Sequence, residues 1–475
     1  MPGASAIVSL SLFGWIPVVI LLFTVLRPTR AVIVAFVGAW LFLPQAGFAI
    51  PGPVPNYDKV SATCLGVFLA AMLFDSQRLA RFRLRWFDAP MLLWIGVGFV
   101  SSFLGGWGPY EATSAIMHQG IMWGLPYFIG RLYLGSVEAL HDLAVALVVG
   151  GLLYVPFCLY EIRMSPQLHA MVYGFHQNDW LQTRRGGGWR PTVFMEHGLA
   201  VGAYMCAAAL LAVWLWLSRA ARSVMGVPIA LAAVVLLGTA VACKSTGASI
   251  LMVGGLGVLL AARLTRSVWP IWIMAAAPLL YIMARTLGGW RGTELVDLAR
   301  LVSAERAASL QCRLNSETGL WRVVQPRLFL GAGRFIWAGI VPEGTSDRII
   351  PDGMWIIALG RFGLVGLAAF VGIMGLPILG FVRRFQGRAW SSPGASMAGA
   401  WSVVIAIYLI DSLTNAMLNP IFLLAAGGLI GAMPPEAPAP RRVEPEPGRI
   451  RPPARRGFFV PRRPDAPPER GEARA

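Results

Sequence analysis

The sequence predicts an all-α protein, a polytopic transmembrane helical bundle of about 12–13 helices with a long outer loop and a disordered cytoplasmic C-terminal tail. Three observations support this fold class. The 475 residues are 56% hydrophobic and only 13% charged, whereas a soluble domain carries about 25% charged residues. The apolar residues form runs close to the ~20 residues that a helix needs to cross a bilayer. Arg clusters separate these runs and fall on one side of the alternation.

The apolar runs should be helices, because within lipid a helix satisfies its own backbone hydrogen bonds. They do not alternate with a period of two, which argues against a β-barrel. The candidate spans are residues 6–26, 31–48, 60–74, 89–104, 115–134, 143–160, 192–217, 224–241, 248–262, 268–284, 354–382, 397–410 and 421–433. The chain then divides into N-terminal helices, helices with an outer polar loop, a large outer loop, C-terminal helices and a tail, with the boundaries 1–160, 161–284, 285–353, 354–433 and 434–475.

The distribution of arginine orients the bundle. Besides the tail, four Arg-rich segments fall on the same side: 78–85, 219–222, 263–266 and 383–388. That side is cytoplasmic by the positive-inside rule, so loops 161–191 and 286–353 are expected outside. The same distribution accounts for the net charge of +17 without a nucleic-acid partner, because no basic face with interleaved aromatics lies on a soluble domain.

The tail and the cysteines predict no further chemistry. The tail after Met433 is rich in Pro and Arg without apolar periodicity, so it should be disordered. Its arginines could contact anionic lipid headgroups or simply anchor the topology.

Four of the five cysteines fall in or beside apolar runs, where Cys behaves as a small hydrophobe. Their spacing fits neither a disulfide framework nor a metal site. No Walker motif, haem pair or zinc spacing appears elsewhere in the sequence, so no metal and no cofactor are expected.

Polar clusters at the outer ends of the spans are the functional candidates, because ionisable residues in or beside spans are costly. In the first cluster a helix is expected to start near Pro191 and to carry Glu196 and His197 in its first two turns, just beyond Arg190. Proline suits a helix start, and the helix dipole favours Glu there. A wetted interface and a functional site fit this pattern equally well.

The second cluster is centred on Lys244, which lies beside Ser245 and Thr246 on the predicted outer side. Its ammonium could bind an anionic oxygen as a point charge. A lysine that snorkels to the membrane interface is the other interpretation.

The third cluster occupies the long outer loop, which is too long for a simple connector. Residues 293–310 predict an amphipathic helix that could lie on the membrane surface and roof a cavity. Arg306, Arg313 and Glu317 follow along the loop. Repeated Arg suits phosphate, because the guanidinium fork pairs two oxygens; a solvated helix face is the simpler interpretation for about half of these arginines.

The fourth cluster begins at Asp352, where the chain re-enters the membrane. Asp352 fits an N-cap as well as it fits a general base beside an Arg-lined cavity. Arg361 follows some two turns deeper, and Asp411, Asn415 and Asn419 form a modest polar patch between the last two spans.

These clusters resemble one family. The hydrophobic run after Asp352 closes in Gly363-Leu364-Val365-Gly366, and it is preceded by Trp321, Pro326, Gly331-Ala332-Gly333 and the loop arginines Arg306 and Arg313. This pattern, over residues 190–431, resembles the O-antigen ligase and polymerase family of bacterial envelope glycosyltransferases. Two positions depart from it: Asp352-Gly353 stands where ligases often carry His-Asn, and Lys244-Ser245 stands where many members carry Ser-Arg.

The resemblance implies a metal-independent glycosyltransferase in the bacterial inner (cytoplasmic) membrane. It would polymerise or ligate undecaprenyl-pyrophosphate-linked glycan units onto a glycan acceptor at the periplasmic face, in exopolysaccharide or O-antigen biosynthesis. Its partners would include membrane lipids and proteins of polysaccharide export or chain-length control. The implied catalytic residues are Asp352, His197 and Glu196, and the implied substrate-binding residues are Arg190, Lys244, Arg306, Arg313, Glu317 and Arg361.

A polysaccharide or lipid transporter, or flippase, is the competing function. Transporters also have many helices and buried charge, but they often show an internal repeat with a site at the membrane midplane. This sequence has no evident repeat, and its polar residues gather near one face. A purely structural membrane protein would leave the outer Arg cluster unexplained.

Overall fold

The computed structural model describes residues 6–185, 187–333, 351–385 and 392–433. The predicted disordered tail, residues 434–475, lies outside the described residues. Regular secondary structure in the described chain is almost entirely helical, which confirms the all-α class. Its α-helices are α1 (Ala6–Val25), α2 (Pro28–Phe42), α3 (Lys59–Phe74), α4 (Ser76–Ala80), α5 (Ala89–Leu104), α6 (Gly108–Gln119), α7 (Leu125–Tyr133), α8 (Val137–Met164), α9 (Leu168–Tyr173), α10 (Gly198–Leu217), α11 (Ile229–Ala242), α12 (Thr246–Thr265), α13 (Trp269–Thr286), α14 (Thr293–Val302), α15 (Ala304–Val324), α16 (Met354–Arg384), α17 (Pro393–Asp411) and α18 (Pro420–Gly431).

Strand structure in the described chain is limited to two short antiparallel hairpins. The first joins β1 (Arg184–Arg185) to β2 (Gly188–Trp189), and the second joins β3 (Ser223–Val224) to β4 (Val227–Pro228). Neither hairpin could form a membrane-spanning sheet, because a spanning strand needs about 9–11 residues.

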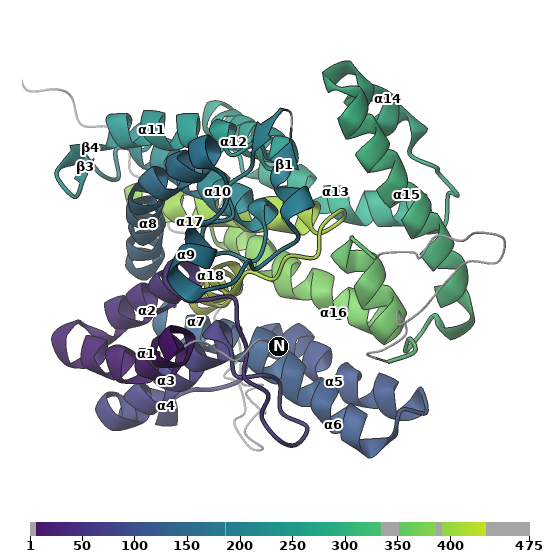
Figure 1. Ribbon diagram of the computed structural model, residues 1–475, viewed down its shortest axis with the longest axis horizontal. Helices are drawn as coiled ribbons and strands as arrows, with labels where there is room; N and C mark the ends of the chain where they lie inside the picture. The colour runs from purple at the N-terminus through teal and green to yellow at the C-terminus, as the bar shows by residue number, and fades with distance from the viewer. Residues whose placement is uncertain (1–5, 186, 334–350, 386–391, 434–475) are drawn as a thin grey trace, which may run out of the picture. The chain divides into compact units, whose positions relative to one another are not determined.

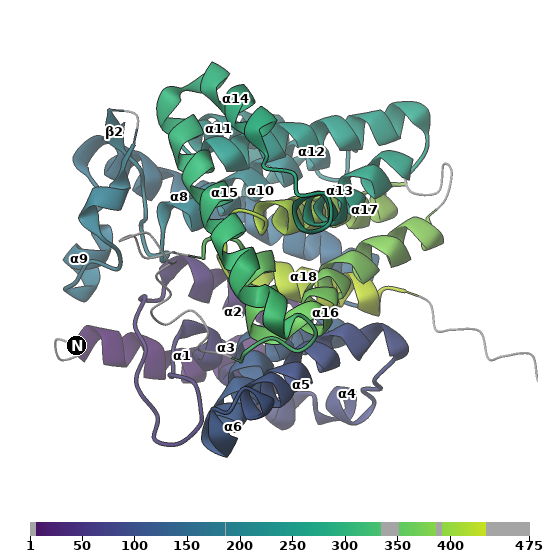
Figure 2. The same cartoon turned by 90° about the vertical axis from the view of Figure 1, so that its right-hand side faces the viewer.

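Six helices in the described chain are long and apolar enough to cross a membrane, which indicates a multi-pass membrane protein. They are α1, α5 with the turn before it, α8, α10, α12 and α16, and five shorter apolar helices accompany them. The most buried of the six is α10, and α18 is also buried along nearly its whole length. In both ribbon views α18 lies between the helices of residues 198–286 and those of residues 6–133 (Figures 1 and 2).

Contacts between helix ends gather the Arg-rich segments at one end of the bundle. Arg263 donates to the carbonyl of Leu217 at 2.6 Å, which joins the end of α12 to the end of α10. Arg131 pairs with Asp88 at 2.8 Å, and Arg85 donates to the carbonyl of Met433 at 3.4 Å. These contacts follow the alternation of Arg in the sequence.

The opposite end holds the loops that carry the polar clusters. The backbone N–H of Gln45 donates to His169 Nε2 at 3.1 Å, which joins the segment after α2 to α9. The indole N–H of Trp107 donates to the carbonyl of Ala332 at 2.8 Å, which joins the turn after α5 to the long loop. Residues far apart in sequence therefore meet at this end.

One predicted span is interrupted. The sequence predicts a single span over residues 115–134, but a π-helical turn at Gly120–Gly124 separates α6 from α7. Two glycines in the turn and Pro126 just after it weaken the regular hydrogen-bond ladder.

The long loop also differs from its prediction. Instead of one helix over 293–310, the structure has α14 and α15, separated by Ser303. Ser303 is extended and its hydroxyl accepts from the backbone N–H of Arg306 at 3.2 Å, so it ends one helix and caps the next. Leu298 and Leu301 of α14 are 61% and 83% exposed, which suits a helix that lies on a membrane surface.

A break in α16 explains the glycines of its sequence motif. Gly363 has φ 67° and ψ −163°, a conformation essentially restricted to glycine. The loop segment 328–333 fills the break: Leu364 N–H donates to the carbonyl of Leu328 at 2.8 Å, and Gly333 N–H donates to the carbonyl of Arg361 at 2.9 Å. A Cβ on Gly363 or on Gly331 would overlap the facing backbone. These glycines therefore allow two backbone segments to pair without side chains between them.

Replacing Gly363 with Ala is expected to destabilise the protein strongly. The backbone conformation alone costs about 1–3 kcal/mol for a non-glycine residue, and the added Cβ meets the Phe329 carbonyl. Thermal unfolding of the detergent-solubilised protein should show the loss. Gly375→Ala in the same helix is the matched control, because a Cβ there meets nothing within 4 Å, and equal melting temperatures for the two variants would contradict the expectation.

Candidate functional site

A cavity of about 530 Å³ opens at the end of the bundle that holds the polar loops. Its walls come from the β1–β2 hairpin and the segment after it, from α10, α12, α13, α14 and α15, and from the end of α17 with the segment that follows. Four arginines line it, Arg185, Arg190, Arg306 and Arg313, together with the polar residues Ser245, Asp411 and Asn415 and an apolar wall that includes Leu251, Ala277 and Leu310. The cavity therefore combines a cationic wall with apolar surface.

Arg190 is the most deeply buried of these cations, at 3% exposure. Its Nη2 donates to Ser245 Oγ at 3.2 Å, but its Nε has no hydrogen-bond partner and no carboxylate of the described chain lies within 4.0 Å. Burial, followed by Arg185 and Arg306, lowers the pKa of Arg190 to about 10. A buried charge without a counter-ion is unfavourable, so the cavity favours an anionic ligand.

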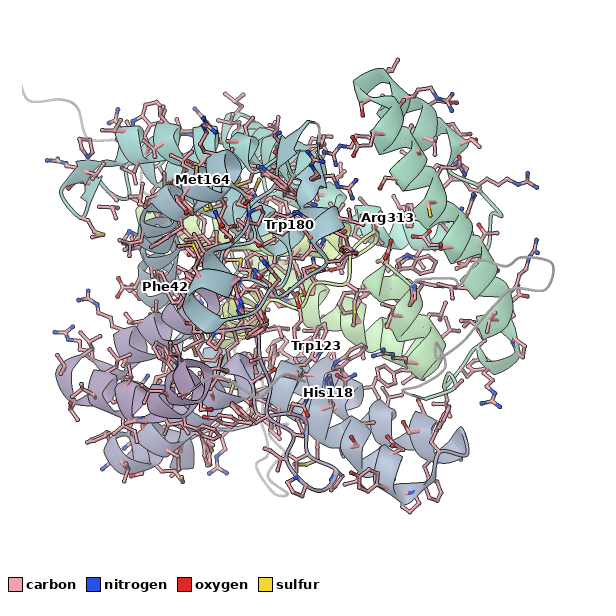
Figure 3. The ribbon with its side chains drawn as sticks, viewed as in Figure 1. Phe42, His118, Trp123, Met164, Trp180 and Arg313 are labelled. Carbon is pink, nitrogen blue, oxygen red and sulfur yellow. The ribbon has the colours of Figure 1, made fainter. Side chains whose placement is uncertain are left out.

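Arg306 and Arg313 lie on one face of α15, since seven residues make about two helical turns. Arg313 points from α15 toward the bundle (Figure 3). Its Nη1 donates to Asn415 Oδ1 at 3.1 Å, and Asn415 Nδ2 donates to Asp411 Oδ1 at 2.8 Å. The sequence shows Asp411 and Asn415 only as a modest polar patch, and the fold brings them into the cavity. The sequence feature that could have indicated this is Asp411 itself, a carboxylate in the last turn of an apolar helix.

Asp352 does not cap α16, contrary to one interpretation of the sequence. The N-cap is Gly353, without a side-chain hydrogen bond, and the N–H of Met354 donates instead to the carbonyls of Ser412 and Asn415. These carbonyls from the segment after α17 remove the need for a carboxylate cap.

The Asp352 carboxylate pairs instead with Arg313, whose Nε lies 3.4 Å away, and its side chain is 42% exposed. Burial raises the pKa of this carboxyl group, and Arg313 opposes the shift. Asp352 therefore lies next to a cavity arginine and remains accessible from solvent.

Lys244 lies behind the cavity wall and is absent from its lining. Its ammonium donates to the carbonyl of Arg185 at 3.2 Å, and its own carbonyl accepts from Arg306 Nη2 at 3.4 Å. Arg185 pairs in turn with Glu305 at 3.0 Å. In this arrangement Lys244 supports the β1–β2 hairpin and orients Arg306.

Glu196 and His197 precede α10, which begins at Gly198 and not near Pro191 as the sequence predicts. The helix starts late because His197 is its N-cap: Nδ1 accepts from the N–H of Leu199 at 3.0 Å. Nε2 lies 3.2 Å from Gln182 Oε1, so this nitrogen carries the proton. Burial, followed by Arg190, lowers the pKa of His197 to about 4, and the imidazole is neutral with both nitrogens engaged.

Glu317 and Arg361 lie outside the cavity lining. Glu317 is 4% exposed and accepts from Tyr281 at 2.8 Å, Arg285 at 3.1 Å and Trp355 at 3.2 Å. This network holds α15 against α13 and α16. The carbonyl of Arg361 accepts from the long loop at the break in α16.

Within the described ranges no group of three His, Cys, Asp or Glu side chains could hold a metal ion. A scan against protein-family models and a search of curated proteins find no match to this chain.

Proposed function

We propose that this protein transfers a glycan from an undecaprenyl-pyrophosphate donor to a hydroxyl of an acceptor glycan, as a polymerase or ligase of the O-antigen ligase and polymerase type. The observation that carries the proposal is the Arg-lined cavity, in which Arg190 is buried without a counter-ion. A diphosphate supplies the oxygens that guanidinium groups pair best. The same groups stabilise the negative charge that develops on a diphosphate leaving group.

The apolar part of the cavity supports a lipid-borne donor. Ile250 of α12 lines the cavity and is 59% exposed, so the cavity wall continues onto an apolar outer surface of a helix that could span the membrane. Leu298 and Leu301 of α14 extend this apolar exposure above the cavity. A polyprenyl chain could therefore stay in lipid while its diphosphate enters the cavity.

The proposed reaction takes place at the periplasmic face of the bacterial inner membrane. The Arg-rich end of the bundle is the cytoplasmic end by the positive-inside rule, which puts the cavity outside. The acceptor oxygen attacks the anomeric carbon of the donor, and the bond from that carbon to the diphosphate breaks. Asp352 accepts the hydroxyl proton, and undecaprenyl pyrophosphate leaves. Asp411 acts through Asn415 to position Arg313.

Reporter fusions test this orientation. Fusions after Arg85, Arg222, Arg266 and Arg388 should report cytoplasm, because these positions follow the Arg-rich segments. Fusions within residues 161–191 and 286–353 should report periplasm. A cytoplasmic signal from 286–353 would remove the basis for a periplasmic glycosyltransferase site.

A flippase for lipid-linked glycans is the second candidate, because the same cationic cavity would bind a diphosphate head group without breaking a bond. Purified protein in lipid vesicles, supplied with undecaprenyl-pyrophosphate-linked repeat units, separates the two functions. A glycosyltransferase releases undecaprenyl pyrophosphate and lengthens the glycan. A flippase moves the intact lipid between leaflets and forms no product. In the producing bacterium, a deletion strain should lose long polysaccharide chains if the first function is right.

A further inference from the structure

A second cavity, of about 310 Å³, lies at the same end of the bundle. Six residues in its wall carry polar or charged groups: Trp40, Gln45, Asn56, Asp58, Lys59 and Glu196. It shares two chain segments with the Arg-lined cavity. Segment 190–199 contributes Arg190 to the first and Glu196 to the second, and segment 412–419 contributes Asn415 to the first and Leu418 to the second. The two cavities are therefore neighbours.

The second cavity contains a buried cation without an ion pair. Lys59 is 4% exposed, and its ammonium donates to the carbonyls of Trp40 at 3.2 Å and Phe194 at 3.4 Å. In the orientation that satisfies its amide, Gln45 Oε1 also accepts from Lys59 at 2.6 Å and from the N–H of Glu196 at 2.9 Å. Where the chain is described, no carboxylate lies within 4.0 Å of the Lys59 ammonium.

Two further groups in this wall have unused hydrogen-bonding capacity. The indole N–H of Trp40 is buried without an acceptor, and Trp40 is itself 4% exposed. The carboxylate of Glu196 makes no hydrogen bond or ion pair within the described chain, whereas that of Asp58 caps α3. The Trp40 indole N–H is fully covered, so the group that faces the cavity with unused hydrogen-bonding capacity is the partly exposed carboxylate of Glu196, which can accept from a polar ligand.

We propose that this second cavity binds a sugar residue of the acceptor glycan, an inference that rests on the proposed glycosyltransferase function. This wall holds two carboxylates, Asp58 and Glu196, and one ammonium, Lys59. The excess negative charge disfavours a diphosphate, so the second cavity should bind a different ligand from the Arg-lined cavity. Sugar hydroxyls both donate and accept, as do the groups in this wall. The volume is near the lower end of small-molecule pockets. A glycan held here can extend along the shared segments and present its terminal hydroxyl to the donor.

Crossed binding measurements test the assignment. The first probe is the undecaprenyl-pyrophosphate-linked repeat unit, prepared from a strain that lacks this protein. The amount of this lipid that stays bound to the protein after purification is measured. The second probe is lipid-free oligosaccharide prepared from the same bacterium's polysaccharide, measured by calorimetry. Glu196→Gln and Asn56→Ala should retain the lipid and weaken oligosaccharide binding roughly tenfold, about the effect of one lost hydrogen bond. Arg190→Ala should lose the lipid and keep the oligosaccharide. Asn315→Ala, on an exposed part of α15 outside both cavities, should change neither.

Three outcomes have different meanings. Oligosaccharide binding that is unchanged in both Glu196→Gln and Asn56→Ala would overturn the acceptor site. Loss of the lipid in these two variants would assign the second cavity to the donor and would also overturn it. If wild-type protein binds oligosaccharide but retains no undecaprenyl-pyrophosphate lipid, the proposed donor is wrong and the proposed glycosyltransferase function is refuted.

Discussion

Arg190→Ala is expected to abolish polymer formation while the protein inserts normally and melts at an equal or higher temperature. Arg190 is buried without a counter-ion in the described chain, and removing an unpaired buried charge relieves an unfavourable desolvation. Each hydrogen bond to a charged group contributes about 1.5–3 kcal/mol, so losing a guanidinium fork should lower donor affinity roughly 10²-fold or more. A structural arginine would behave in the opposite way, since its removal lowers stability.

Matched variants make this result specific. Arg190→Lys should restore only part of the activity, because an ammonium cannot offer two parallel donors. Arg313→Ala and Arg306→Ala should also lose polymer at normal protein level, since both guanidinium groups line the cavity. Arg291→Ala is the control, because Arg291 is exposed and outside the cavity. Normal polymer from the Arg190, Arg306 and Arg313 variants would refute the diphosphate site.

Asp352→Asn is expected to leave insertion and stability nearly unchanged and to reduce glycan transfer roughly 10²–10⁴-fold, the usual effect of losing a general base. The loss of a cap cannot explain such a result, because Gly353 is the N-cap of α16. The ion pair with Arg313 is partly exposed, and exposed pairs contribute only about 0–1 kcal/mol. Asp352→Glu should keep a fraction of the activity.

The pH dependence of the rate provides an independent measurement. A carboxyl group accepts a proton only when it is ionised, and burial raises the pKa of Asp352. The wild-type rate should therefore fall as the pH falls through that raised pKa. In Asp352→Asn the residual rate should lose this dependence. If the rate of the variant still falls in the same way at low pH, the group that titrates is not Asp352.

His197→Ala is the comparison that decides between the two candidate bases. His197 caps α10 and both of its ring nitrogens are engaged, so its loss should cost about 1 kcal/mol of stability and leave most of the transfer rate. If His197→Ala loses activity while Asp352→Asn keeps it, His197 is the base. Asp411→Asn should lower the rate by a smaller factor than Asp352→Asn, because Asp411 acts on Arg313 through Asn415.

The helices could be predicted well from the sequence, but their ends and breaks could not. Runs of apolar residues specify helices in lipid wherever they occur, and the structure has a helix in each of these runs. The predicted start of α10 near Pro191 was wrong, because His197 caps the helix with its side chain and the helix begins only at Gly198. The break at Gly363 was missed because a segment about thirty residues earlier in the chain, 328–333, satisfies the exposed backbone groups.

For the site, the sequence by itself determined which groups carry charge. The helix that it predicted ended at residue 310, before Arg313, so only the structure showed that Arg306 and Arg313 share a face of α15. The sequence could not determine partners. Glu317 became the counter-ion of Arg285 in a buried network, Lys244 became a support for the β1–β2 hairpin, and Asp411 joined the cavity. Helical periodicity is local and can be read along the chain, whereas the distance between Arg313 and Asn415 depends on how α15 packs near the end of α17. Only the tertiary structure decided which cavity cation is both buried and without a carboxylate partner in the described chain, as Arg190 is.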